Sequence, residues 1–157
     1  MKKILLICGF LTLVQWSYAQ SLSQGTEIGN IAPEINLPNP DGKKIALSSL
    51  RGKVVLIDFW ASWCGPCMTF GPIFEKTSDA YPEVTFAKID TEAQQELARA
   101  FNIMSIPTLM IIRDQIVIFN QAGALPQSAL TQLVDQALSL DMDAVRAELT
   151  NEATDSE

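Results

Sequence analysis

The sequence has no histidine and only three cysteines among its 157 residues. Catalysis by a Cys-His pair is therefore excluded, and too few ligands remain for a zinc site, which uses about four Cys and His side chains. Basic residues are also scarce, with 11 Lys and Arg against 18 Asp and Glu and a formal net charge of −7. Without a basic stripe the chain is poorly suited to nucleic acid or an anionic membrane. We expect no metal or other cofactor and no nucleic-acid partner.

Long hydrophobic runs are missing as well. The uncharged run from Ile4 to Val14 has 11 residues, well short of the ~20 that a membrane-spanning helix needs. It follows Lys2 and Lys3 and precedes Ser17-Tyr18-Ala19, which has small residues at the two positions a signal peptidase reads. We predict a signal peptide, residues 1–19, and export, to the periplasm if the source is a Gram-negative bacterium. The alternative is a signal retained as a membrane anchor.

Cleavage after Ala19 removes Cys8 and leaves Cys64 and Cys67, separated by Gly65 and Pro66. The preceding run, residues 54–60, is apolar and β-branched, typical of a strand buried on both faces. Because a helix is expected to start at the motif, unpaired N–H groups and the helix dipole favour a thiolate at Cys64. We predict that Cys64 attacks and Cys67 resolves. A purely structural disulfide is the alternative, but a loop of four residues constrains little chain.

The segment from Val55 to Cys67 resembles the active-site region of thioredoxins, including Asp58, Trp60 and Trp63. The resemblance implies an α/β thioredoxin fold, with a central mixed β-sheet flanked by helices. It also implies a thiol-disulfide oxidoreductase.

Asp58 is charged in a strand otherwise built for burial, so desolvation should raise its pKa and let it take the Cys67 proton. A polar strand end is the alternative. Lys88 aligns with a thioredoxin lysine near that carboxylate and is a candidate for proton-transfer support, although a solvent-facing lysine is equally compatible. Trp63 is expected to shield Cys64 and contact substrate beside Gly65 and Pro66.

Ser105-Ile106-Pro107-Thr108 resembles the thioredoxin Ile-Pro-Thr segment. The resemblance implies a cis-proline that faces the dithiol, with the backbone of Ile106 pairing with a substrate peptide. Gly123 matches a thioredoxin glycine that lines the docking groove. Ile106, Pro107 and Gly123 are therefore candidate substrate-binding residues.

The N-terminal third differs from the opening of a cytoplasmic thioredoxin. Apolar residues alternate on both sides of the turn signal at residues 39–42, which predicts a hairpin extension, residues 33–53, that resembles exported TlpA-like thioredoxins. In peroxiredoxins the peroxidatic cysteine lies in a Thr/Ser-x-x-Cys context, whereas Ala occupies position 61, three residues before Cys64. A peroxiredoxin is therefore disfavoured. The predicted organisation has a flexible lead-in (20–32), a thioredoxin-like domain (33–149) and an acidic disordered tail (150–157).

Further strands are expected at 84–89, 108–112 and 116–121 and a last amphipathic helix around 130–138. Thr91 and Gln94 offer a capping box for a helix that ends near Phe101. Between the last two strands, Asp114-Gln115 stands where thioredoxins have Asn-Gly or Asp-Gly. Because Gln115 accepts positive φ less readily than glycine, we expect a distorted or longer turn.

Gly-Pro between the cysteines resembles reducing thioredoxins, with potentials near about −270 mV against about −120 mV for the oxidant DsbA. We therefore predict a protein-disulfide reductase whose partners are disulfide-containing exported proteins and a membrane thiol-transfer electron donor. The alternatives are a disulfide oxidase or isomerase, and a redox-inert module that binds peptides in the thioredoxin groove.

Overall fold

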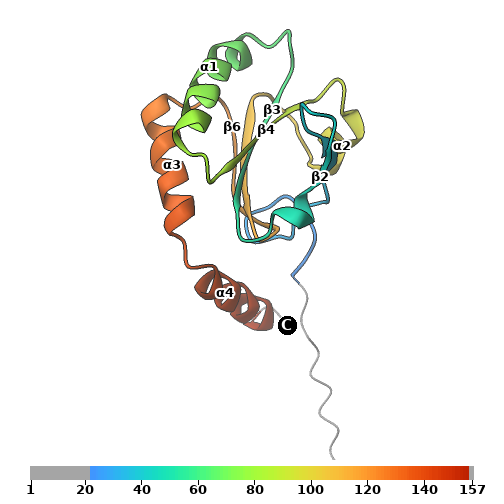
Figure 1. The fold of residues 1–157 in the computed structure, drawn as a ribbon. Helices are drawn as coiled ribbons and strands as arrows, with labels where there is room; N and C mark the ends of the chain where they lie inside the picture. The colour runs from blue at the N-terminus through green and yellow to red at the C-terminus, as the bar shows by residue number, and fades with distance from the viewer. Residues whose placement is uncertain (1–21, 156–157) are drawn as a thin grey trace, which may run out of the picture.

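The computed structural model describes residues 22–155, so the predicted signal peptide lies outside the described residues. A four-stranded sheet in the order β4-β3-β5-β6 forms its centre (Figure 1). Strand β3 pairs in parallel with β4 and antiparallel with β5, which confirms the predicted mixed sheet. The strands are β3 (Val54–Trp60), β4 (Thr85–Asp90), β5 (Thr108–Arg113) and β6 (Ile116–Ala122). The helices are α1 (Gly65–Ala80), α2 (Gln95–Ala100), α3 (Gln127–Ser139) and α4 (Met142–Asp155).

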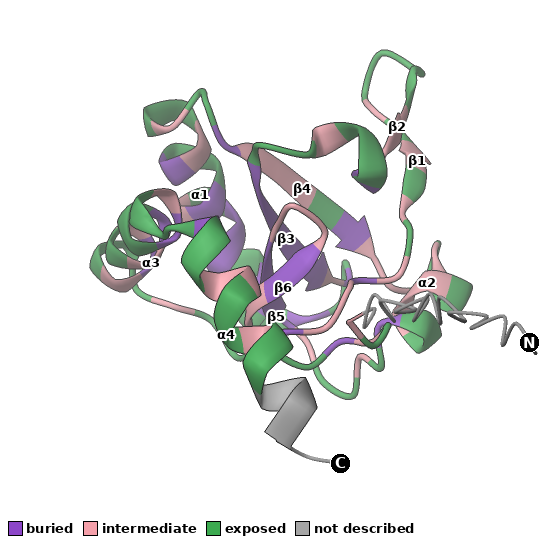
Figure 2. Cartoon of the chain, turned by 90° about the horizontal axis from the view of Figure 1, so that it is seen from below, coloured by how far each residue is buried: buried purple, intermediate pink, exposed green. Residues whose placement is uncertain are grey.

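Helices α1 and α3 cover one face of the sheet, while α2 and the N-terminal hairpin lie on the other (Figure 1). Strand β3 is buried on both faces, as its continuous apolar sequence predicted (Figure 2). Its alternate residues serve two cores: Leu56 packs in the cluster with α1 and α3, and Ile57 in the cluster with the hairpin and α2.

Helix α1 presents a narrow apolar stripe to the sheet. Phe70, Phe74 and Thr77 are buried at helical spacing. Pro72 lies inside the helix but on its exposed side. Any carbonyl that loses its partner to the proline is therefore near solvent, which explains why the helix continues past it.

The N-terminal hairpin, β1 (Asn36–Pro38) and β2 (Lys44–Ala46), forms a separate antiparallel sheet followed by the short 3₁₀ helix η1 (Leu47–Leu50). Its turn closes through the N–H of Lys43, which donates to Asn39 Oδ1 at 2.8 Å. The predicted hairpin is thus confirmed. Apolar side chains of the hairpin pack on the core. The hairpin does not pair with β4, which remains an edge strand of the main sheet.

Residues 22–32 are not the predicted flexible lead-in. Their backbone follows the start of β6: the N–H of Gly29 donates to Val117 O and that of Ala32 to Gln115 O, both at 2.8 Å. The side chain of Asn120 also donates to Thr26 O at 2.9 Å. The edge of the sheet supplies the partners that order this polar segment.

The predicted disordered tail, residues 150–157, is wrong over residues 150–155, because α4 continues to Asp155; residues 156 and 157 lie outside the described residues. Asp141 accepts hydrogen bonds from the N–H groups of Asp143 and Ala144 and caps the start of α4.

None of the helices in residues 22–155 combines the length and the apolar sequence that a membrane span requires.

The connection between β5 and β6 is a tight two-residue turn rather than the distorted or longer one expected. Asp114 and Gln115 both take positive φ, 54° and 67°. Asp114 accepts from the N–H of Gly52 at 2.6 Å, and Arg51 donates to the side chain of Gln115. These long-range contacts offset the cost of a left-handed backbone at two non-glycine residues.

The expected capping box of α2 does not form. The side chain of Asp90 accepts from the N–H groups of Glu92 and Ala93 instead. Thr91 Oγ1 donates to Trp60 O at 3.1 Å, which ties the end of β4 to the end of β3.

Candidate functional site

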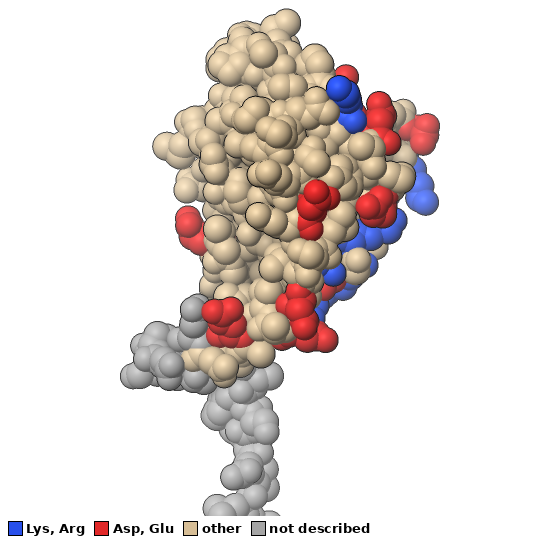
Figure 3. All heavy atoms as spheres, turned by 90° about the vertical axis from the view of Figure 1, so that its left-hand side faces the viewer, with Lys and Arg blue, Asp and Glu red and all other residues tan. Residues whose placement is uncertain are grey.

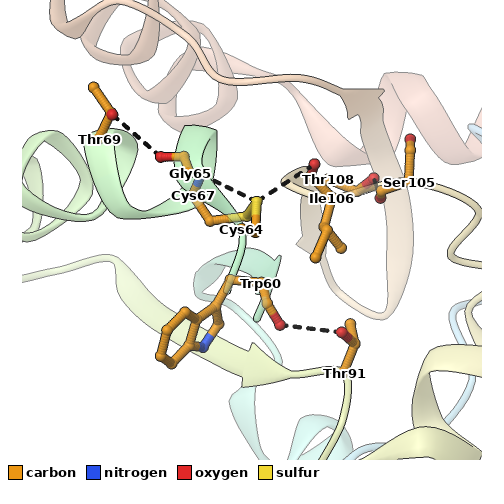
Figure 4. The surroundings of a disulfide bond; sticks show 9 residues. All are labelled: Trp60, Cys64, Gly65, Cys67, Thr69, Thr91, Ser105, Ile106 and Thr108. Atoms are coloured by element: carbon orange, nitrogen blue, oxygen red, sulfur yellow. Dashed lines mark hydrogen bonds between the residues drawn. A yellow bond between two sulfur atoms is a disulfide. The ribbon is translucent and has the colours of Figure 1, made fainter. Parts of the chain in front are cut away.

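Cys64 and Cys67 form a disulfide at the start of α1 (Figure 4). Cys64 is the N-cap of the helix, and its sulfur accepts a hydrogen bond from the N–H of Cys67 at 3.2 Å. Pro66 lies in the first turn, where a missing N–H is harmless. The same N–H and the positive helix end favour a thiolate at Cys64 when the disulfide is reduced.

The two cysteines differ little in burial in the disulfide state. Cys64 is 4% exposed and Cys67 2%. Exposure therefore does not distinguish the two sulfurs in this state. The two cysteines differ in their position at the helix end. Cys64 Sγ accepts a hydrogen bond from the backbone N–H of Cys67.

The segment before β5 lies opposite the disulfide (Figure 4). The Ile106-Pro107 peptide bond is cis, as the resemblance implied, and Ile106 O lies 3.7 Å from Cys64 Sγ. Pro107 O accepts from the N–H of Gly123 at 2.8 Å, and Gly123 has a φ of 105° that favours glycine. The structure thus places Ile106 beside Cys64 Sγ and joins Gly123 to Pro107, the next residue along the chain.

Asp58 is fully buried in β3 on the sheet face that packs against α1. Neither carboxylate oxygen has a hydrogen-bond partner among the described residues. Desolvation raises the pKa of Asp58 to about 6, and the charge of nearby Lys88 opposes that rise. A carboxyl group with this pKa exchanges its proton near neutral pH, as a general base must.

Lys88 lies opposite Asp58 in the β3–β4 register. Its ammonium sits 4.8 Å from the centroid of the Trp60 ring and 3.3 Å from Glu75 Oε1. The contact with Trp60 is within cation–π range. Glu75 was not among the predicted site residues, and no local motif could have identified it because it meets Lys88 from a different element.

The tryptophans around the motif differ in environment. Trp63 is 68% exposed, so most of its surface faces solvent. Trp60 is half-buried, and its side chain points away from the sulfurs (Figure 4). Within residues 22–155, no cluster of three or more His, Cys, Asp or Glu could hold a metal ion.

The fold and this site define a thiol-disulfide redox protein of the thioredoxin type. The thioredoxin family model matches residues 44–136, and the chain belongs to that family. A putative thioredoxin 2 of Streptomyces coelicolor is 63% identical over 92 residues, covering 59% of this chain and 69% of that protein. The thioredoxin of Bacillus subtilis is 41% identical over 86 residues, covering 54% and 83%.

Solved structures agree with this assignment. The X-ray structure of Fasciola hepatica thioredoxin superposes with a TM-score of 0.54 at 30% identity and covers 57% of this chain and 86% of that one. Thioredoxin of Malassezia sympodialis gives a TM-score of 0.51 at 40% identity, with 55% and 79% covered.

Proposed function

We propose that the protein is an extracytoplasmic protein-disulfide reductase that works through Cys64 and Cys67. The observation that supports this best is the position of the disulfide at a helix N-terminus, with Ile106 O 3.7 Å from Cys64 Sγ. A backbone carbonyl beside the reactive sulfur offers an acceptor for the N–H of an extended substrate segment.

In the proposed reaction, the Cys64 thiolate attacks one sulfur of a substrate disulfide. The substrate S–S bond breaks, a mixed disulfide forms and one substrate thiolate leaves. Asp58 then accepts the Cys67 proton, and the Cys67 sulfur attacks Cys64. The mixed disulfide breaks, the second substrate sulfur leaves as a thiolate that takes up a proton, Asp58 releases the proton it accepted, and the Cys64–Cys67 disulfide remains. Two electrons have passed from the dithiol to the substrate.

The source of those electrons is the second part of the proposal. An exported reductase needs a donor that carries reducing equivalents across the membrane, so a membrane thiol-transfer protein would reduce Cys64–Cys67 after each cycle. The predicted signal peptide and the TlpA-like hairpin support this location. N-terminal sequencing of exported protein should start at Gln20, and a start at Met1 would contradict cleavage.

The reductase proposal is tested on purified residues 20–157. With dithiothreitol as electron source the protein should reduce insulin, and Cys64→Ser should not. Equilibration with glutathione should give a reduction potential of about −270 mV. A potential of about −120 mV would favour the oxidase alternative. No reduction by the wild type would favour the redox-inert peptide-binding module.

A further inference from the structure

The ammonium group of Lys88 is held on the α1 side of the sheet. Its Nζ atom lies 3.3 Å from Glu75 Oε1 and 4.8 Å from the centroid of the Trp60 ring. It also lies beside Gly71 of α1, where an added Cβ would be 3.4 Å from Nζ. Asp58 is opposite Lys88 in the β3–β4 register, yet neither of its oxygens has a hydrogen-bond partner among the described residues. The ammonium therefore binds Glu75 and not the buried carboxyl group.

Other charged groups around Asp58 are scarce or already engaged. Residues 59–74, which include the first part of α1, contain no charged side chain. Asp135 on α3 accepts a hydrogen bond from a tyrosine hydroxyl, and Arg113 on β5 donates to carbonyls at the end of α3. Asp90, at the end of β4, accepts from N–H groups of the following turn. The remaining charged residues of α1 are exposed: Lys76 and Asp79. On the side of the molecule that carries α1 and α3, Lys and Arg side chains gather near one margin (Figure 3).

We propose that Glu75 is a positioning residue for Asp58: by holding the Lys88 ammonium over α1, it keeps this counter-ion from pairing with the buried carboxyl group and so preserves a proton acceptor at neutral pH. Glu75 thereby serves the step of the proposed function in which Asp58 accepts the Cys67 proton, and its role in catalysis rests on that function.

The direction of the effect follows from electrostatics. Burial raises the pKa of Asp58 to about 6, and the charge of Lys88 opposes that rise. An ammonium released from Glu75 can approach more closely and would lower the pKa of Asp58 further. A carboxylate with a lower pKa is a weaker base. The Glu75 side chain is 68% exposed and that of Lys88 30%, so solvent screens their pair and the shift should be modest.

Carbon-13 NMR of the Asp58 carboxyl group in the oxidised protein measures this effect directly, because Cys64 and Cys67 do not titrate as a disulfide. Glu75→Gln removes the charge but keeps the size of the side chain. We expect it to lower the titration midpoint of Asp58 by about 0.5 pH unit, which is about threefold in proton affinity. Asp79→Asn is the matched control: it removes an exposed acid one turn further along α1 and should leave the midpoint unchanged.

A second background tests whether Glu75 acts through Lys88. Lys88→Gln should raise the midpoint, because the cation that opposes the effect of burial is gone. Adding Glu75→Gln to Lys88→Gln should then change the midpoint little. An equal shift in both backgrounds would mean that Glu75 acts as a distant charge, and no shift in the wild-type background would mean that it does not restrain Lys88. Either result overturns the positioning role.

Kinetics separate this role from the proposed reaction. The rate of mixed-disulfide resolution, measured by stopped flow against pH, should show the same downward shift of its midpoint in Glu75→Gln. An NMR shift without a kinetic shift would support the hold of Glu75 on Lys88 and overturn Asp58 as the base for Cys67. If the wild type reduces no disulfide, the reductase proposal fails, and the NMR titration still decides whether Glu75 positions Lys88.

Discussion

Burial of the Asp58 carboxylate carries a cost in stability that depends on pH. In the unfolded chain this group has its ordinary pKa of 3.8, and in the folded protein about 6. The folded state therefore holds the proton more tightly. The stability contributed by the protonated form is fully present below about pH 3.8 and is lost as the pH rises through about 6.

Asp58→Asn removes this titration and should stabilise the protein selectively at high pH. A pKa difference of about two units corresponds to about 3 kcal/mol as an upper value. We expect the free energy of unfolding of the variant, relative to wild type, to increase by about 2 kcal/mol between pH 4 and pH 8. Urea titrations at both pH values measure it. Exposed Asp79→Asn is the control and should show no such trend.

The same substitution tests Asp58 as a base. Because Asp58 is proposed to serve Cys67 and not Cys64, Asp58→Asn should slow resolution of mixed disulfides more than their formation. Stopped-flow kinetics with a disulfide peptide resolve the two steps. Equal slowing of both would contradict this role.

The assignment of the nucleophile is tested by trapping. Since the Cys67 N–H and the helix end favour the Cys64 thiolate, Cys67→Ser should accumulate substrate as a mixed disulfide and Cys64→Ser should not. Non-reducing gels should show a higher-mass band that disappears with reductant. The two cysteines are almost equally covered in the disulfide state. Equal trapping by both variants would therefore show that the helix end does not make Cys64 the preferred nucleophile.

At the scale of elements, the β5–β6 turn connects distant parts of the chain. Asp114 accepts from the N–H of Gly52 and pairs with Arg146 of α4, both at 2.6 Å. Asp114→Ala should lower the free energy of unfolding by about 1–3 kcal/mol, because it removes two hydrogen bonds to a charged acceptor. Asp143→Ala provides the control: Asp143 pairs with the same arginine but is 96% exposed, so its loss should change stability little. Urea unfolding of both variants compares them.

Elements with a local signal were predictable. The hairpin followed from alternation around a strong turn, and β3 from its continuous apolar run. Two of the misses share one cause: the deciding partner is distant in sequence. Residues 22–32 are ordered by β6, and the turn at Asp114 by Gly52 and Arg146. The same holds in the site, where the motif revealed Cys64 and Cys67 but not the contact of Lys88 with Glu75.

At the scale of the whole molecule, the segments that carry the disulfide, the cis-proline and Gly123 (residues 59–74, 100–112 and 115–134) hold no charged residue, and the charged groups of the site, Asp58, Lys88 and Glu75, lie outside these segments. The chain has a net charge of −7. Removal of the signal peptide would take away Lys2, Lys3 and no acidic residue, leaving 9 basic against 18 acidic side chains and a net charge of −9. The segments around the disulfide contribute none of it. Electrostatics should therefore act on substrates mainly through the long-range field of the protein.

This separation predicts how salt changes the reaction rate. The second-order rate with an anionic aromatic disulfide should rise several-fold between about 0.01 M and 0.15 M salt, as the Debye length falls from about 30 Å to about 8 Å and repulsion is screened. With cationic cystamine the rate should fall, and with neutral hydroxyethyl disulfide it should stay constant, which makes the neutral compound the control. Stopped-flow assays of the reduced protein measure all three. A response of the same sign for the anionic and cationic disulfides would show that salt acts on the thiol itself, and no response from either would mean that the acidic residues lie too far from the disulfide to affect encounter.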